Sequence, residues 1–132
     1  MDKKSRTVRT PKAVLESEDM AIVSSFLKGL FSADGCFTHS GKHASCCLSV
    51  ASVALRDDFV RLSFRLGFRF RSYSYSHSRG KNLVPLNLAC IGRRNEVLRW
   101  MEVVGSISDG HNRRFSEWKN LIRNVFGVKP EV

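Results

Sequence analysis

An apolar helical pattern passes directly into a period-two strand pattern at Asp34-Gly35, and this junction constrains the fold most. Residues 17–33 predict a central helix, because its apolar side chains occupy more than one side. These are Ile22, Val23, Phe26, Leu27, Leu30 and Phe31. Ser17 predicts the N-cap, with Glu18 and Asp19 in the first turn. We expect Gly35 to end the helix with a positive φ.

The rest of the chain repeats the order helix, strand, strand. Residues 36–42 and 43–53 predict a β-hairpin that turns near Ser40-Gly41. Leu55 to Leu66 predicts an amphipathic helix. A second strand pair follows at 68–77 and 83–91, where Pro85 indicates an edge or a bulge. A helix over 93–104, a loop at 105–114 and a last helix complete the order. The predicted fold class is α+β, with antiparallel hairpins, over residues 17–132 as one domain; residues 1–16 predict a flexible basic arm.

Charge favours a polyanionic partner. Lys and Arg number 22 against 12 Asp and Glu, a net charge of +10, which favours nucleic acid first and an anionic membrane surface second. No apolar run could span a bilayer. Residues 1–12 are polar and basic, unlike a secretory signal, so we expect an intracellular protein that is cytoplasmic, or organellar in a eukaryote.

The placement of acidic residues is more informative than the total. Between Asp19 and Asp57 the one acidic residue is Asp34, and between Asp58 and Glu96 there is none. The second interval contains Arg61, Arg65, Arg69, Arg71, Arg79, Lys81, Arg93 and Arg94. A surface that meets phosphates excludes carboxylates, so an acid inside such a stretch is either paired or used.

The cysteines predict reduced thiols. Cys36, Cys46, Cys47 and Cys90 contain no CxxC pair. A zinc site from His39, His43, Cys46 and Cys47 is the alternative, but adjacent strand residues point to opposite faces.

The first helix ends in Leu27-Lys28-Gly29-Leu30-Phe31-Ser32-Ala33-Asp34-Gly35, which resembles the motif of the LAGLIDADG homing endonucleases. Lys28 replaces a small residue and Ser32 replaces the first motif acid. The order αββαββα also matches the family's core fold, with its saddle-shaped antiparallel sheet.

The resemblance implies a metal site and a homodimer. Asp34 matches the acid that binds a divalent cation such as Mg²⁺, and the carbonyl of Ala33 matches a second ligand. Small residues on one helix face allow two helices to approach closely; they are Ser25, Gly29 and Ser32. A chain with a single motif must dimerise to complete its active site, and a two-fold dimer implies a near-palindromic DNA target.

The resemblance also places DNA on the sheet. The residues predicted to face DNA are Thr38, Ser40, Lys42, Ser45, Cys47, Ser49, Arg69, Arg71, Tyr73, Tyr75, His77, Arg79 and Lys81. In the loop 105–114, His111, Arg113 and Arg114 are candidates for neutralising charge in the transition state. The glutamine that some members carry on the second strand is absent near Ala51 and Ser52.

Three functions are compatible with these observations. The first is Mg²⁺-dependent cleavage of both strands of a long specific DNA site, which serves homing of a host intron. The second is an RNA maturase that assists splicing of that intron. The third is a DNA-binding protein that no longer cuts, and the loss of the first motif acid leaves the last two open.

Overall fold

A computed structural model describes residues 7–126, and it confirms the predicted α+β fold. The elements, in chain order, are α2 (Lys12–Leu15), α3 (Met20–Asp34), β1 (Gly35–Ser40), β2 (His43–Val50), α4 (Val53–Arg65), β3 (Arg71–Arg79), β4 (Asn82–Ile91), α5 (Arg94–Val103) and α6 (Asp109–Phe126). From α3 to α5 the order is helix, strand, strand, helix, strand, strand, helix, with α6 at the C-terminal end.

The four strands form one antiparallel sheet in the order β1-β2-β4-β3, so the two hairpins meet at its centre. Strand β2 pairs with β4 only from Val50↔Asn87 to Cys46↔Ile91, whereas β3 pairs with β4 along its whole length. The outer part of the β3–β4 hairpin is therefore a two-stranded ribbon. Pro85 lies in this ribbon, where one side of β4 has no neighbour, and this satisfies the edge position predicted for it.

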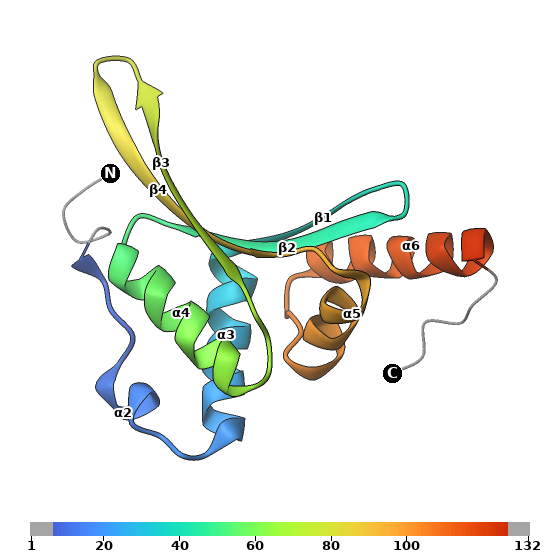
Figure 1. Cartoon of the computed structure of the whole chain (residues 1–132), viewed down its shortest axis with the longest axis horizontal. Coiled ribbons are helices and arrows are strands. Elements are labelled where there is room, and N and C mark those ends of the chain that lie inside the picture. Colours follow the sequence, from blue (N-terminus) through green and yellow to red (C-terminus); the bar gives the residue numbers. More distant parts are fainter. Residues whose placement is uncertain (1–6, 127–132) are drawn as a thin grey trace.

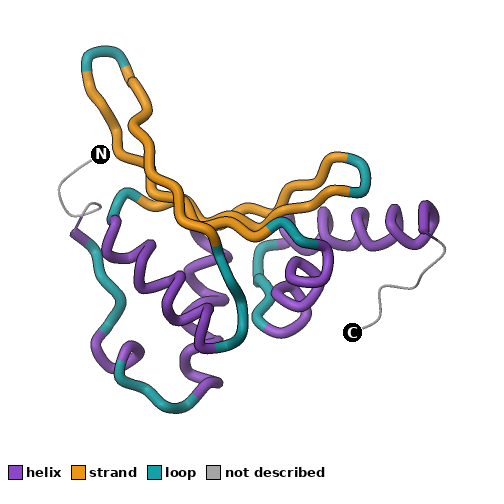
Figure 2. Tube along the Cα trace, viewed as in Figure 1, coloured by secondary structure: helices purple, strands orange, loops and turns teal. Residues whose placement is uncertain are grey.

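Helices cover one face of the sheet and leave the other open (Figure 1). Helices α3, α4 and α5 lie beneath its centre, and α6 lies beneath the β1–β2 hairpin. The two hairpins diverge from the centre, so the uncovered face is concave like a saddle (Figure 2). One face of the sheet is thus available to a partner along its whole length.

The core between sheet and helices is built around Trp100. Its ring contacts Phe31, Phe59, Phe68 and Phe70 edge-on, with centroid separations of 4.8 to 5.6 Å. All five side chains are buried, and edge-to-face aromatic packing adds to the free energy gained by burying apolar area. This cluster joins α3, α4, α5 and the segment before β3 into one body.

Two predictions about α3 are wrong. The N-cap is Asp19, whose carboxylate accepts a hydrogen bond from the Ala21 N–H at 2.9 Å, while Ser17 accepts from the Asp19 N–H. Gly35 is extended, at φ −91° and ψ 171°, rather than left-handed. The helix runs without a turn straight into β1.

The segment before α3 contacts α4. The Ser52 hydroxyl donates to the Val8 carbonyl, and Arg9 forms a 3.2 Å ion pair with the buried Asp58. Arg65 donates to the Ser17 carbonyl at 2.5 Å. Residues 7–16, which belong to the expected flexible arm, are therefore attached to the domain; residues 1–6 lie outside the described chain.

Candidate nucleic-acid interface and motif helix

The strand register places the predicted DNA-facing residues on the open face. Cys46, Leu48 and Val50 are buried against the helices, so the intervening residues of β2 face the open side. Directly paired residues share a face. The open face therefore carries Thr38 and Ser40 on β1, Ser45, Cys47 and Ser49 on β2, and Arg71, Tyr73 and Tyr75 on β3. The Thr38 and Ser45 hydroxyls lie 3.0 Å apart across the strand pair.

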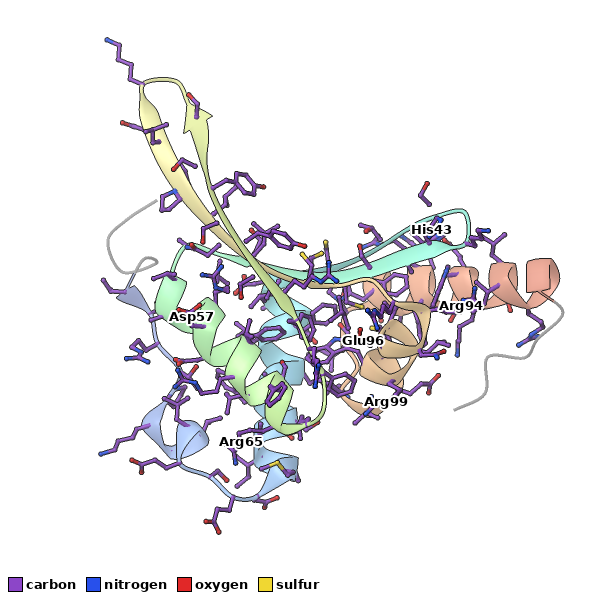
Figure 3. The ribbon with its side chains drawn as sticks, viewed as in Figure 1. His43, Asp57, Arg65, Arg94, Glu96 and Arg99 are labelled. Carbon is purple, nitrogen blue, oxygen red and sulfur yellow. The ribbon has the colours of Figure 1, made fainter. Side chains whose placement is uncertain are left out.

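Basic side chains line the β3 side of the open face. Arg69, Arg71 and Arg93 surround an open depression together with Tyr73 and Glu96. Glu96 accepts a hydrogen bond from the Arg69 N–H at 3.4 Å, and Figure 3 shows it on α5. Lys42 and Lys81 are exposed at the hairpin tips. The side chains of His77 and Arg79 lie outside the described ones, although their backbone belongs to β3.

Strand β4 contributes an open-face stripe that the sequence analysis missed. Cys90 pairs with Cys47, and this register puts Val84, Leu86 and Leu88 on the same face, half-buried beside the two tyrosines. Residues at both the odd and the even positions of β4 are largely apolar, so alternation alone could not show which of them face the core. Apolar side chains at this position are suited to contact thymine methyl groups in a major groove.

A buried arginine supports the sheet where the ribbon leaves it. The Arg56 guanidinium on α4 donates to the carbonyls of Tyr73 and Leu88 and to the Ser74 hydroxyl, at 2.7 to 3.3 Å. Its Nε donates to Asp57 at 2.7 Å, and Asp57 is labelled on α4 in Figure 3. Not every arginine near the sheet thus serves the open face. Arg56 itself sets the position of the β3–β4 ribbon relative to the helices.

Asp34 is the last residue of α3, and its side chain is exposed. Within residues 7–126, its carboxylate has no hydrogen bond or ion pair. The C-terminal end of a helix carries partial negative charge, so an unpaired carboxylate there is unfavourable unless a cation binds. The same helix end bears the carbonyl of Ala33. The oxygen atoms gathered there are the ligand type preferred by hard divalent cations.

Gly35 is required for a close approach rather than for a turn. A Cβ atom at this position would lie 2.5 Å from the Phe31 carbonyl oxygen and against its ring. The Gly35 N–H donates to that same carbonyl and closes α3. A side chain at residue 35 would therefore move the helix end that carries Asp34.

A polar network holds the end of α3 from below. The Ser32 hydroxyl donates to the Lys28 carbonyl at 2.6 Å and accepts from the Ile107 N–H at 2.9 Å. Ser106 joins Ser32 to His111, with 2.7 Å between Ser106 Oγ and His111 Nδ1. His111 Nε2 lies 3.0 Å from the Gly35 carbonyl, which can only accept, so Nε2 carries a proton. Ser32, predicted to face a second copy, is thus half-buried at the edge of that helix face.

Burial lowers the pKa of His111 and outweighs the opposing effect of its bond to the Gly35 carbonyl; the Arg114 cation lowers the pKa further. In the neutral imidazole, Nε2–H donates to the Gly35 carbonyl, and Nδ1 accepts when the single Ser106 hydrogen is directed to it rather than to Ser32. His111 is buried at 4% exposure, so it lies beneath the motif end rather than on the open face.

Helix α6 covers the free edge of β1. The helix begins at Asp109, so the predicted loop is shorter and the three basic candidates lie on helix turns. Arg114 Nε donates to the Phe37 carbonyl at 2.9 Å, and Trp118 Nε1 donates to the Lys42 carbonyl at 3.0 Å. Arg113 is exposed, 4.0 Å from Glu117. Side-chain donors from α6 thus satisfy one carbonyl of the edge strand β1 and one of the turn that follows it.

The exposed side of α3 carries Ile22 near its start and small residues along the rest of its length. Ser25, Gly29 and Ala33 recur every four residues and are exposed. A Cβ atom on Gly29 would meet nothing within 4 Å, so packing within the chain does not require glycine. Glycine inside a helix costs about 0.5–1 kcal/mol relative to alanine. This cost is explained if a second backbone approaches closely at this point.

The described residues of one chain hold no group of three or more His, Cys, Asp or Glu side chains placed to share a metal ion. The alternative zinc ligands are divided by the sheet, with Cys46 on the core side and Cys47 on the open side. Among residues 7–126, no helix is long and apolar enough to cross a membrane.

Residues 21–115, from the start of α3 into α6, match the family model of the LAGLIDADG-like domain. A search of curated proteins found no match.

Proposed function

The chain belongs to the LAGLIDADG-like domain family, a family of homing endonuclease-like proteins, and from this premise we propose that it cleaves both strands of a specific DNA site. In this proposal it acts as a homodimer on a long, near-palindromic target. It requires Mg²⁺ or another hard divalent cation. Cleavage of an allele that lacks the host intron would serve homing of that intron.

The observation that carries the proposal is the position of Asp34 relative to the open face. The exposed carboxylate stands at the junction of α3 and β1, and β1 continues directly into the surface that bears Thr38 and Ser40. A DNA duplex seated on that surface would bring its phosphates close to the helix end. A carboxylate at such a place repels phosphates unless a cation lies between them.

The open face has the chemistry of a DNA-reading surface. Arg69, Arg71, Lys42 and Lys81 supply donors for phosphates and for guanine edges. Hydroxyls from β1 and β2 supply short polar contacts, and the stripe on β4 supplies apolar ones. The uncovered face of a curved antiparallel sheet is better suited to enter a major groove than to enclose a small molecule.

Asp34 and the Ala33 carbonyl are the groups that would hold the cation. One chain provides a single carboxylate at this position, so a second copy is needed to complete the ligand set. A bound divalent cation would activate water and stabilise the leaving oxygen. The chain's own contribution is to hold the α3 end rigidly, through Gly35, Ser32 and His111.

Arginines of α6 are proposed to reduce the negative charge that develops at the phosphate. Arg113 is exposed and free to reach a bound backbone, apart from its long contact with Glu117. Arg114 is hydrogen-bonded to β1 and would contribute positive electrostatic potential, whereas the buried, neutral His111 would hold the end of α3 in place.

The test is the single substitution Asp34→Asn, with Glu18→Gln, an exposed residue before α3, as the charge-matched control. Bound sequences are selected from a randomised duplex library, and cleavage and binding are then measured with Mg²⁺ and with EDTA. Asp34→Asn should abolish cleavage while binding is unchanged or tighter, because a repulsive charge is removed. It should also raise the free energy of unfolding by about 0.3–1 kcal/mol, since an acid is removed from a helix C-terminus. The control should cleave like the parent.

Each competing function gives a different result. Specific DNA binding without cleavage by the parent would identify a DNA-binding protein that does not cut. Retention of intron RNA at high salt, without DNA cleavage, would identify a maturase. Wild-type cleavage by Asp34→Asn would reject the role proposed for this residue.

A further inference from the structure

Three thiols form one row across the open face. Cys36 on β1 pairs directly with Cys47 on β2, and Cys47 pairs directly with Cys90 on β4. Arg71 on β3 continues the row beside Cys90. Cys46 points the other way and is buried in the core. Cys47 and Cys90 are half-buried and Cys36 is exposed, so small reagents can reach all three.

The Cys47–Cys90 pair has the backbone geometry of a disulfide. Directly opposed residues in an antiparallel pair have Cα atoms about 4.5–5.5 Å apart, within the range that a disulfide spans. Both side chains leave the sheet on the same face, so the two thiols lie beside each other on directly paired residues. Cys36 is also opposite Cys47, but it is exposed on the edge strand β1, whereas Cys90 is half-buried beside Cys47 and its thiol lowers the pKa of Cys47.

We propose that Cys47 and Cys90 are a reactive dithiol that a low-molecular-weight disulfide oxidises to a cross-strand disulfide between β2 and β4. The proposal concerns thiol chemistry of the free protein and does not depend on the nuclease function. It assigns a modification site to the open face.

The two thiols have different roles because their environments differ. Interaction with the Cys90 thiol lowers the pKa of Cys47 to about 7, against the effect of its partial burial, and a contact with Ser45 adds to the lowering. The same interaction raises the pKa of Cys90, and so does burial. Cys47 is therefore the attacking thiolate, and Cys90 is the resolving thiol.

The reaction takes place in two exchange steps. The Cys47 thiolate attacks one sulfur of a disulfide RSSR, which forms a Cys47–S–S–R bond and releases RS⁻. Cys90 then loses its proton to solvent and attacks Cys47 Sγ, which forms the Cys47–Cys90 bond and releases the second RS⁻. Each RS⁻ is protonated by solvent. Two thiols of the protein are oxidised and one RSSR is reduced to two RSH.

The experiment treats the reduced full-length protein with glutathione disulfide and maps the products by mass spectrometry after trypsin digestion. Cleavage after Lys and Arg places Cys36, Cys47 and Cys90 on separate peptides, covering residues 29–42, 43–56 and 82–93. The expected product joins 43–56 to 82–93 and lacks two hydrogens. Iodoacetamide should label Cys47 about tenfold faster than Cys36 at pH 7.

Cysteine-to-serine variants show which sulfur attacks the disulfide and which one resolves the adduct. Cys90→Ser should stop the reaction at a glutathionyl adduct on Cys47, and Cys47→Ser should abolish the cross-link, which separates Cys47 from its neighbour Cys46. Cys36→Ser is the matched control and should form the disulfide at the parent rate. A cross-link between 29–42 and 43–56 would overturn the proposal. So would a glutathionyl adduct that persists in the parent as long as it does in Cys90→Ser, or no reaction at Cys47.

Discussion

At the scale of single residues, the motif end is held by groups that do no chemistry themselves. Gly35 lets β1 start against Phe31, and Ser32 fastens the loop before α6 to α3. His111 then holds the Gly35 carbonyl, one residue beyond Asp34. Ser32 occupies the position of the first motif acid. A hydroxyl there both donates to a carbonyl and accepts from a backbone N–H, and a carboxylate could not donate.

The lowered pKa of His111 predicts how stability varies with pH. In the unfolded chain, a histidine titrates near its ordinary value of about 6.5, whereas folded His111 resists protonation to a lower pH. The contribution of His111 to the free energy of unfolding is therefore complete above about pH 6.5. It is lost as the pH falls, because the unfolded state binds the proton first. His111→Gln removes this titration. It should destabilise the fold by roughly 1–3 kcal/mol at pH 7.5, and by less at pH 5.5.

Urea unfolding followed through the buried Trp100 and Trp118 measures the difference between parent and variant at both pH values. All other residues are the same in both proteins, so their effects cancel in that difference. A gap in unfolding free energy that is the same at both pH values, or wider at pH 5.5, would contradict a neutral His111.

At this scale the sequence reveals local chemistry but not long-range partners. The motif predicts Asp34 as a metal ligand and Gly35 as the residue at which the helix ends. The local pattern placed the N-cap at Ser17 because Ser17 and Asp19 are both favoured capping residues two positions apart, and Asp19 takes that role in the structure. His111 and Gly35 are 76 residues apart, and no local pattern could predict their hydrogen bond.

At the scale of elements, period-two alternation predicted the face of each strand where polar and apolar residues truly alternate. In β2 and in residues 68–75, the predicted inward and outward residues agree with the strand register and burial. Alternation could not orient β4, which is apolar on both faces. The start of α6 was also missed, because Gly110 and its polar neighbours are typical of a loop while Asp109 opens a helix.

The β3 edge of the open face gives a prediction about DNA affinity. Arg71 projects from β3 beside Cys90, within the depression that also holds Arg69. Arg71→Ala should cost roughly 1–3 kcal/mol per contact if the side chain reads a base. If Arg71 instead contacts a phosphate, its removal should make the binding affinity less dependent on salt concentration. A dimer would double either effect, because it uses the residue twice.

Arg61→Ala is the control, since Arg61 is exposed on α4, beneath the sheet, and the same charge is lost. Affinities are measured by fluorescence anisotropy over a range of salt concentrations. Equal losses in the two variants would show that net charge, rather than the open face, governs binding.

At the scale of the whole molecule, the described part of one chain does not hold the full set of metal ligands that the proposed cleavage requires. It presents a single carboxylate at the motif end, a concave surface with one motif helix beneath it, and a helix face of small residues without a partner. A two-fold dimer through α3 would supply the second carboxylate and extend the open face into a longer surface. The order of the strands and the position of α3 under their centre could not be deduced from local patterns, because they depend on which hairpins pair.

Gly29 gives the sharpest test of that assembly. Its Cβ position is open within the chain, so Gly29→Val should leave the folded monomer intact, with an unchanged or higher free energy of unfolding. In a dimer through this face, the branched side chain would separate the two backbones, and the variant should sediment as a monomer. DNA affinity and cleavage should fall together, because both depend on two copies. Asn120→Val, at an exposed position on α6, is the control for adding an exposed branched residue to a helix. Sedimentation of the parent as a stable monomer at micromolar concentration with DNA bound would reject dimerisation, and a dimeric Gly29→Val would reject this helix face as the interface.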